Sequence, residues 1–147
     1  MLWPDAGLYF GLFLNAFVAA TLLPAFSELA LASLIVSGAG APALLMVAAT
    51  SGNVLGSCLN WWIGTRLLDF SNRRWFPFSK AQLARGQRLF KRYGYASLLF
   101  AWLPVVGDPL TLAAGVFRAR FGPFLLLVTL GKSLRYGLVI WAAYAAI

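Results

Sequence analysis

Residues 22–28 read LLPAFSE and residues 102–108 read WLPVVGD. Each segment places an acid four residues after a proline, Glu28 in the first and Asp108 in the second. Both segments lie within long hydrophobic stretches, although the chain has only four acidic residues. An acid inside a membrane is costly and is by default a candidate for function. The repeated frame therefore predicts two related functional elements.

The composition is that of a polytopic membrane protein. Of 147 residues, 61% are hydrophobic and 11% are charged, whereas about a quarter of the residues of a soluble domain are charged. Uncharged stretches run over 6–27, 29–65 and 136–147. Because a spanning helix takes about 20 apolar residues, the chain has room for about four or five membrane elements. We expect one membrane domain, residues 1–147.

The chain lacks the residue types that several common kinds of catalytic and metal site require. The chain has no histidine and a single cysteine, Cys58, so histidine catalysis, a histidine metal site and an internal disulfide are excluded. No nucleophile–base motif or phosphate-binding loop occurs, and we expect no enzyme activity, cofactor or metal. No basic residue precedes Arg66. This does not fit a cleaved signal peptide, so we expect the N-terminus to be mature.

The net charge of +8 is concentrated in one connection, since eight of the twelve lysines and arginines lie within 66–92. Positive charge gathers on cytoplasmic connections, so we place 66–92 in the cytoplasm and expect no nucleic-acid binding. Ser79 can cap a helix that runs to about Tyr93. Its apolar face would hold Leu83, Gly86, Phe90 and Tyr93. We expect this amphipathic helix to lie on the anionic leaflet, with a solvated loop as the alternative.

The remaining segments predict an all-α inverted repeat of two opposed re-entrant hairpins plus transmembrane helices. We expect hairpins at about 16–38 and 94–117, and spans at about 43–65 and 121–147. The hairpins would enter from opposite faces and meet near the middle of the membrane. The predicted tip residues are Pro24, Ser27, Pro104, Gly107 and Pro109.

The two acids also have a purely structural interpretation. Asp108 followed by Pro109 fits a helix N-cap followed by proline, and Ser27 before Glu28 offers the same cap. The carboxylates would then only stabilise helix N-termini through the helix dipole. This alternative stays open beside a role in function.

Lys132 and Arg135 lie three residues apart, on one helix face of the last apolar stretch. They need counter-charges, so we expect them to pair with Glu28 and Asp108; snorkelling to an interface is the alternative. Cations could also hold an anionic headgroup, since a guanidinium suits phosphate. The residues that could contribute are Arg118, Arg120, Lys132 and Arg135.

Small and polar residues recur along one side of the span 43–65. They are Gly52, Asn53, Gly56, Asn60 and Gly64. Such a face allows close helix packing. It could serve an internal contact or a homo-oligomer.

Four stretches carry a family resemblance: LLPAFSELALASLIVSG, SGNVLGSCLNWWIGTR, FKRYGYASLLFAWLPVVGDPLTLAAG and LGKSLRYG. Together they resemble the DedA superfamily of bacterial inner-membrane proteins, most closely its small YqaA-type branch. The superfamily includes eukaryotic lipid scramblases with the VTT domain. The resemblance implies paired re-entrant hairpins, membrane homeostasis and, for some members, translocation of undecaprenyl phosphate driven by the proton motive force. It also implies that Glu28 is the essential hairpin glutamate and that Gly94 and Gly115 are the glycines of the second hairpin block.

Two positions depart from the family pattern. The family usually has an aspartate where this chain has Ser57, and an arginine after the hairpin proline where this chain has Gly107 and then Asp108. One acid is thus lost and one is gained. We hypothesise that Lys132 or Arg135 supplies the missing positive charge.

We therefore expect a proton-coupled transporter or flippase of an anionic lipid, with a polyprenyl phosphate as one candidate. Glu28 and Asp108 would take up and release the protons. The alternatives are a gradient-independent lipid scramblase, a small-ion/proton exchanger and a non-transporting membrane partner protein. An intramembrane enzyme that uses the two carboxylates is weaker than these.

Overall fold

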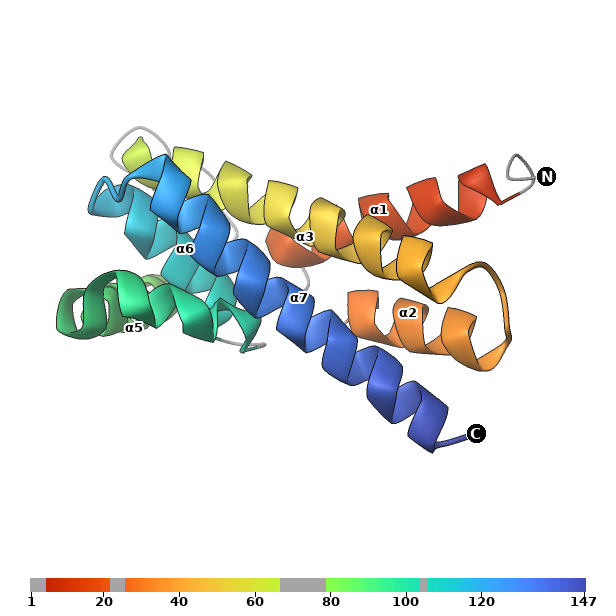
Figure 1. Ribbon diagram of the computed structural model, residues 1–147. Coiled ribbons are helices and arrows are strands. Elements are labelled where there is room, and N and C mark those ends of the chain that lie inside the picture. Colours follow the sequence, from red (N-terminus) through yellow and green to blue (C-terminus); the bar gives the residue numbers. More distant parts are fainter. Residues whose placement is uncertain (1–4, 22–25, 67–78, 104–105) are drawn as a thin grey trace. The chain divides into compact units, whose positions relative to one another are not determined.

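In a computed structural model of the chain, residues 5–21, 26–66, 79–103 and 106–147 are described. Every regular element within these ranges is a helix (Figure 1), which confirms the predicted all-α class. The elements are α1 (Ala6–Thr21), α2 (Phe26–Val36), α3 (Pro42–Thr65), α5 (Lys80–Tyr93), the 3₁₀ helix η1 (Gly94–Trp102), α6 (Gly107–Val116) and α7 (Phe121–Ala145).

Helix length separates two kinds of element. Helices α3 and α7, with 24 and 25 residues, are long and apolar enough to cross a membrane, and they coincide with the predicted spans. Helix α1 has 16 residues and rises about 24 Å, less than the roughly 30 Å of a hydrocarbon core. Helices α2, η1 and α6 are shorter still. Helices α2, η1 and α6 lie within the segments predicted as hairpins, 16–38 and 94–117, whereas most of α1 precedes the first of these segments.

The chain forms two compact units. Unit 1 comprises Met1–Gly56 and Lys132–Ile147, and unit 2 comprises Ser57–Gly131. Helices α3 and α7 therefore contribute residues to both units. Each unit has its own hydrophobic core.

In unit 1, α1 packs closely against the glycine-bearing face of α3. A Cβ atom on Gly52 would overlap the carbonyl group of Phe13, and one on Gly56 would lie 2.6 Å from the Cβ atom of Ala20. Asn53 Nδ2 donates a hydrogen bond to the carbonyl oxygen of Ala16 over 3.0 Å. The buried core of this unit consists of Leu12, Ala16, Leu31, Ile35, Leu45, Ala49, Tyr136 and Ala143.

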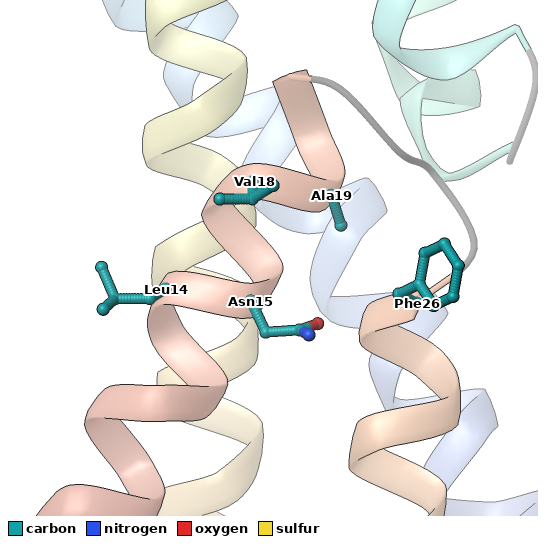
Figure 2. Close-up of a pocket in the computed structure, with 5 residues that line it drawn as sticks. All are labelled: Leu14, Asn15, Val18, Ala19 and Phe26. Carbon is teal, nitrogen blue, oxygen red and sulfur yellow. The ribbon is translucent and has the colours of Figure 1, made fainter.

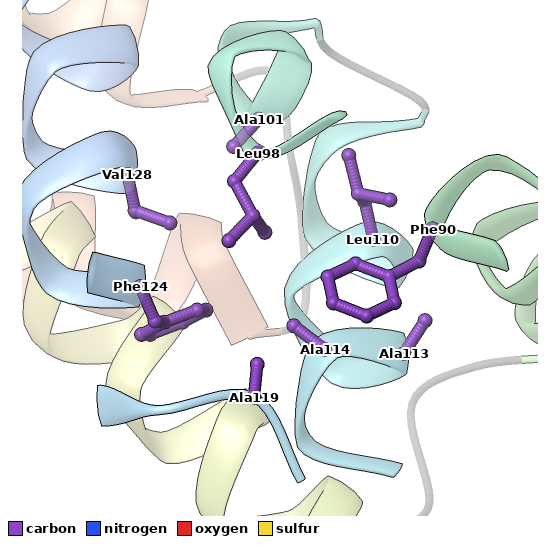
Figure 3. Packing of buried hydrophobic residues seen from close by; sticks show 9 residues of the cluster. All are labelled: Phe90, Leu98, Ala101, Leu110, Ala113, Ala114, Ala119, Phe124 and Val128. Carbon is purple, nitrogen blue, oxygen red and sulfur yellow. The ribbon is translucent and has the colours of Figure 1, made fainter. Parts of the chain in front are cut away.

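In unit 2, α6 is the central element, since every residue from Gly107 to Gly115 is buried. A helix that is apolar on all sides requires packing on all sides. Figure 3 shows its partners, with Phe90 reaching in from α5, Leu98 from η1 and Phe124 from α7. The cluster also contains Ala101, Leu110, Ala113, Ala114, Ala119 and Val128.

The remaining part of the α3 face packs against α6. A Cβ atom on Gly64 would overlap the carbonyl group of Leu112, and one on Gly115 would overlap the carbonyl group of Trp61. Asn60 Nδ2 donates to Thr111 Oγ1 over 3.3 Å. The small-residue face predicted on this span is therefore occupied by contacts within the chain.

Helix α5 begins and ends as predicted. Ser79 Oγ accepts a hydrogen bond from the Gln82 amide over 3.2 Å, and Gln82 Oε1 accepts one from the Ser79 amide over 2.9 Å. This is a complete capping box. A helix lying on a leaflet would direct its apolar face into lipid, but here Gly86 and Phe90 are buried against protein. Tyr93, which we expected on that face, is 49% exposed.

The burial of this face against protein has a simple cause. A Cβ atom on Gly86 would lie 2.6 Å from the carbonyl oxygen of Pro109. Glycine at this position lets the two helix backbones approach closely. The apolar face of α5 therefore packs against α6, and its basic residues point outward. The exposed basic residues of the helix are Lys80, Arg85, Arg88, Lys91 and Arg92.

The predicted N-caps are wrong. Helix α6 starts at Gly107 after Val106, and no side chain caps it. Asp108 is thus inside the first turn. Helix α2 starts at Phe26, so Ser27 is also inside its first turn. The helices begin earlier than the sequence suggests, but both acids remain in first turns, where the helix dipole favours negative charge. The tip residues Pro24 and Pro104 lie outside the described residues.

Helices α2 and α6 end in the same way. The amide of Gly38 donates to Ile35 O and that of Ala39 to Leu34 O; the amide of Arg118 donates to Gly115 O and that of Ala119 to Ala114 O. Both sets are the two hydrogen bonds of a Schellman motif. Its left-handed residue is Gly38 in one helix, with φ 69°, and Arg118 in the other, with φ 53°. The similarity between the two segments thus continues from the acids to the C-terminal ends of α2 and α6.

Candidate functional site

The first turn of α2 is tied to α7 by an ion pair. Glu28 Oε1 contacts Arg135 Nη2, and the two side chains are 19% and 9% exposed. Both residues belong to unit 1. The expected pairing is confirmed for these two residues. Snorkelling of Arg135 to an interface is wrong, because the guanidinium has an internal counter-charge.

A second contact lies directly beside the ion pair. Tyr136 donates its hydroxyl hydrogen to Ser27 Oγ over 2.9 Å, and both side chains are fully buried. Two consecutive residues of α2 therefore meet two consecutive residues of α7. Tyr136 is not among the site residues predicted from the sequence. The available signal is that a buried tyrosine hydroxyl needs a hydrogen-bond partner, but the sequence does not say that Tyr136 is buried.

A cavity of about 280 Å³ lies in unit 1, between α1 and the start of α2. It is lined by Leu14, Asn15, Val18, Ala19 and Phe26. Figure 2 shows the Asn15 amide extending from α1 toward α2, where Phe26 lies. Phe26 is two residues before Glu28. The cavity is thus an apolar space with one amide, next to the turn that carries the ion pair.

Asp108 occupies the corresponding turn of unit 2 and is 6% exposed. Its backbone is held firmly, since Thr111 Oγ1 donates to the Asp108 carbonyl oxygen over 2.7 Å. Asn60 of α3 donates to Thr111 in turn. A Cβ atom on Gly107 would overlap the carbonyl group of Ala101 in η1. The carboxyl group is therefore placed by close contacts of α6 with α3 and η1.

The four predicted cations lie in two different environments. Lys132 and Arg135 of α7 are buried, with Lys132 fully so. Arg118 and Arg120, in the connection between α6 and α7, are exposed. Because Lys132 is fully buried, snorkelling to an interface is wrong for this residue as well. Pairing of Lys132 with Asp108 stays a prediction.

No group of three metal-ligating side chains occurs among the residues that the structure describes. The chemistry available in the described turns is that of charge pairs and hydrogen bonds. A carboxylate paired with a guanidinium can exchange its partner for another anion, or lose its charge by protonation. Both changes would alter how α2 is held on α7.

Comparison with known proteins places the chain among membrane proteins. The family model described as the VTT domain matches residues 6–145. Inner membrane protein YqaA of Escherichia coli (strain K12) is 41% identical over 129 residues, which cover 86% of this chain and 84% of the relative. An uncharacterized protein of Haemophilus influenzae is 36% identical over 141 residues, covering 91% and 85%. No solved structure matches the chain significantly.

Proposed function

Because the chain belongs to the VTT domain (DedA) family of membrane proteins, we propose that it transports an anionic lipid across the bacterial inner membrane, coupled to protons. The name of its relative YqaA, an inner membrane protein, supports this location. In the proposed topology the connection 66–92 is cytoplasmic. The arms α1–α2 and η1–α6 form two opposed re-entrant hairpins. In this proposal the acids lie at membrane depth, each in the first turn of a short helix.

The ion pair between Glu28 and Arg135 is the observation that carries the proposal. Arg135 can neutralise one anion at a time, either the carboxylate of Glu28 or the phosphate of a lipid. Protonation of Glu28 removes its charge and releases Arg135 for the phosphate, to which a guanidinium can bind in bidentate fashion. When the lipid leaves, Glu28 loses its proton and pairs with Arg135 again. The lipid and one proton thus move together.

The cavity between α1 and α2 supports a lipid rather than a small ion as the substrate. Its lining is apolar apart from the amide of Asn15. Apolar side chains offer nothing to a hydrated ion, which would lose its water without compensation. An acyl or prenyl chain is accommodated by such a surface. In the proposal this surface, which Phe26 lines at the start of α2, receives the hydrocarbon chain of the lipid.

Asp108 is proposed as a second proton site, in the equivalent turn of unit 2. Like Glu28, it lies in the first turn of a short helix. A polyprenyl phosphate such as undecaprenyl phosphate is the first substrate to test. Transport of this kind changes no covalent bond, so we propose no enzymatic reaction and no cofactor.

The test is movement of a labelled polyprenyl phosphate across the membrane of proteoliposomes. The proposal expects movement that increases with a pH gradient in the wild type and is lost in Glu28→Gln and Asp108→Asn. Movement that is equally fast without any gradient would instead indicate a scramblase. Proton flux without added lipid would indicate a small-ion exchanger. No movement by folded wild-type protein would remove this lipid as the substrate.

A further inference from the structure

Arg118 adopts a backbone conformation that suits glycine. It is the left-handed residue of the Schellman motif that ends α6, with φ 53°. L-amino acids with a Cβ atom are disfavoured there. The same motif at the end of α2 uses Gly38. A residue with a side chain at a strained backbone position is a candidate for a functional role of that side chain.

Three chain segments of unit 2 meet around this arginine. Trp61 Nε1, near the end of α3, donates to the Ala119 carbonyl oxygen over 3.0 Å. The amide of Arg120 donates to the hydroxyl of Tyr95 over 2.7 Å. The ring of Phe117 stacks on that of Phe90, near the end of α5, at 5.5 Å. The end of α3, the connection 117–120 and the end of α5 are therefore fixed next to one another.

These segments carry a concentration of exposed positive charge, which we call the basic rim. It consists of Arg66, Lys91, Arg92, Arg118 and Arg120, all exposed. Asp108 is the only acidic residue that the structure describes in unit 2, and it is buried. The basic rim is thus a cationic surface. Among the described residues of unit 2, no exposed acid neutralises it.

Exposed aromatic rings accompany these charges. The Arg66 guanidinium carbon lies 5.4 Å from the ring centre of Trp62, and that of Arg92 lies 5.3 Å from the ring centre of Tyr93. Further exposed rings are Tyr95, Phe117 and Phe121. Amphipathic rings such as those of Trp62, Tyr93 and Tyr95, beside lysine and arginine, are typical of the headgroup level of a membrane.

We infer that the basic rim is a binding site for the phosphate headgroup of an anionic lipid, with Arg118 as its principal ligand. The charges are complementary, and the aromatic rings suit the level at which such phosphates lie. The site takes the lipid class of the proposed function but uses none of the residues of the proposed proton step. It would hold the headgroup at the membrane surface before transport.

The test is thermal unfolding of the purified full-length chain in a non-ionic detergent. Phosphatidylglycerol, phosphatidylcholine or inorganic phosphate is added in increasing amounts, because a ligand that binds the folded state raises the melting temperature. We expect phosphatidylglycerol alone to raise it. Equal stabilisation by phosphatidylcholine or by inorganic phosphate would overturn a site for anionic lipid headgroups. The assay requires no transport, so its failure is distinguishable from failure of the proposed function.

Arg118→Gly separates binding from folding. Glycine suits the left-handed backbone, so the melting temperature without lipid should stay the same or rise. Loss of a charge-assisted bond should weaken phosphatidylglycerol binding about tenfold or more. The matched control is Lys80→Gln, which removes one exposed charge at the opposite end of α5 and should bind as the wild type does. Wild-type affinity of Arg118→Gly for phosphatidylglycerol, or an equal loss in Lys80→Gln, would overturn the assignment of the site to Arg118.

Discussion

Tyr136 donates a hydrogen bond to Ser27 over 2.9 Å, one residue along both helices from the Glu28–Arg135 ion pair. This bond joins two uncharged groups, so protonation of Glu28 does not affect it. It can keep the first turn of α2 on α7 while Arg135 changes partner. In the proposed function the two adjacent contacts therefore have separable roles, one in holding the helices and one in responding to protons.

Tyr136→Phe should destabilise the fold without removing the ion pair. It deletes a buried hydrogen bond, which contributes about 1 kcal/mol to the free energy of unfolding. The measurement is thermal or denaturant unfolding in detergent. Tyr144→Phe is the control, because Tyr144 is 53% exposed. Equal stability of the two variants would contradict the structural role of the Tyr136 hydroxyl.

Arg135→Gln should destabilise more than Glu28→Gln/Arg135→Gln. The single variant leaves the largely buried Glu28 carboxylate without its counter-charge, and breaking such a pair from one side costs about 3 kcal/mol. The double variant has no buried charge at this position. Unfolding of the two proteins at one pH checks the prediction. A double variant that is less stable than the single one would show that the two side chains do not act as a pair.

Gly115→Ala should disrupt the contact between α6 and α3. The added methyl group would overlap the carbonyl group of Trp61, and overpacking of this kind costs about 1–3 kcal/mol. Gly122→Ala is the matched control, since nothing lies within 4 Å of the position of its Cβ atom. The melting temperatures of the two variants give the answer. Similar values would mean that the close approach of the helices is not required.

Ser79→Ala should loosen the start of α5. It removes the hydroxyl that accepts from the Gln82 amide, and loss of an N-cap costs about 1 kcal/mol. Hydrogen exchange of the first-turn amides should become faster. Ser79→Asp keeps a capping oxygen and should exchange as slowly as the wild type. Unchanged exchange in Ser79→Ala would contradict a stabilising capping box.

Much of the fold follows from local physics that the sequence displays. The spans coincide with α3 and α7 because length and hydropathy alone define them. The cap of α5 follows from Ser79 and Gln82, which lie three residues apart. The pairing of Glu28 with Arg135 was predictable because so few acids are available in the apolar stretches.

Contacts that depend on tertiary arrangement were not predictable. The apolar face of α5 is evident from the sequence, but amphipathicity does not say whether lipid or α6 covers it. Ser27 looks like an N-cap because its type suits one, yet α2 begins earlier and turns Ser27 toward Tyr136. The left-handed conformation of Arg118 has no sequence signal, since glycine is the usual residue there.

The most direct test of the central claim is proton uptake on lipid binding. A short-chain polyprenyl phosphate is added to the detergent-solubilised protein in weak buffer, and the pH of the solution is recorded. If the lipid displaces Glu28 from Arg135, the wild type should take up about one proton per bound lipid more than Glu28→Gln does, by linkage of binding to protonation. Equal uptake by the two proteins, both folded and both binding the lipid, would contradict exchange of anions at Arg135.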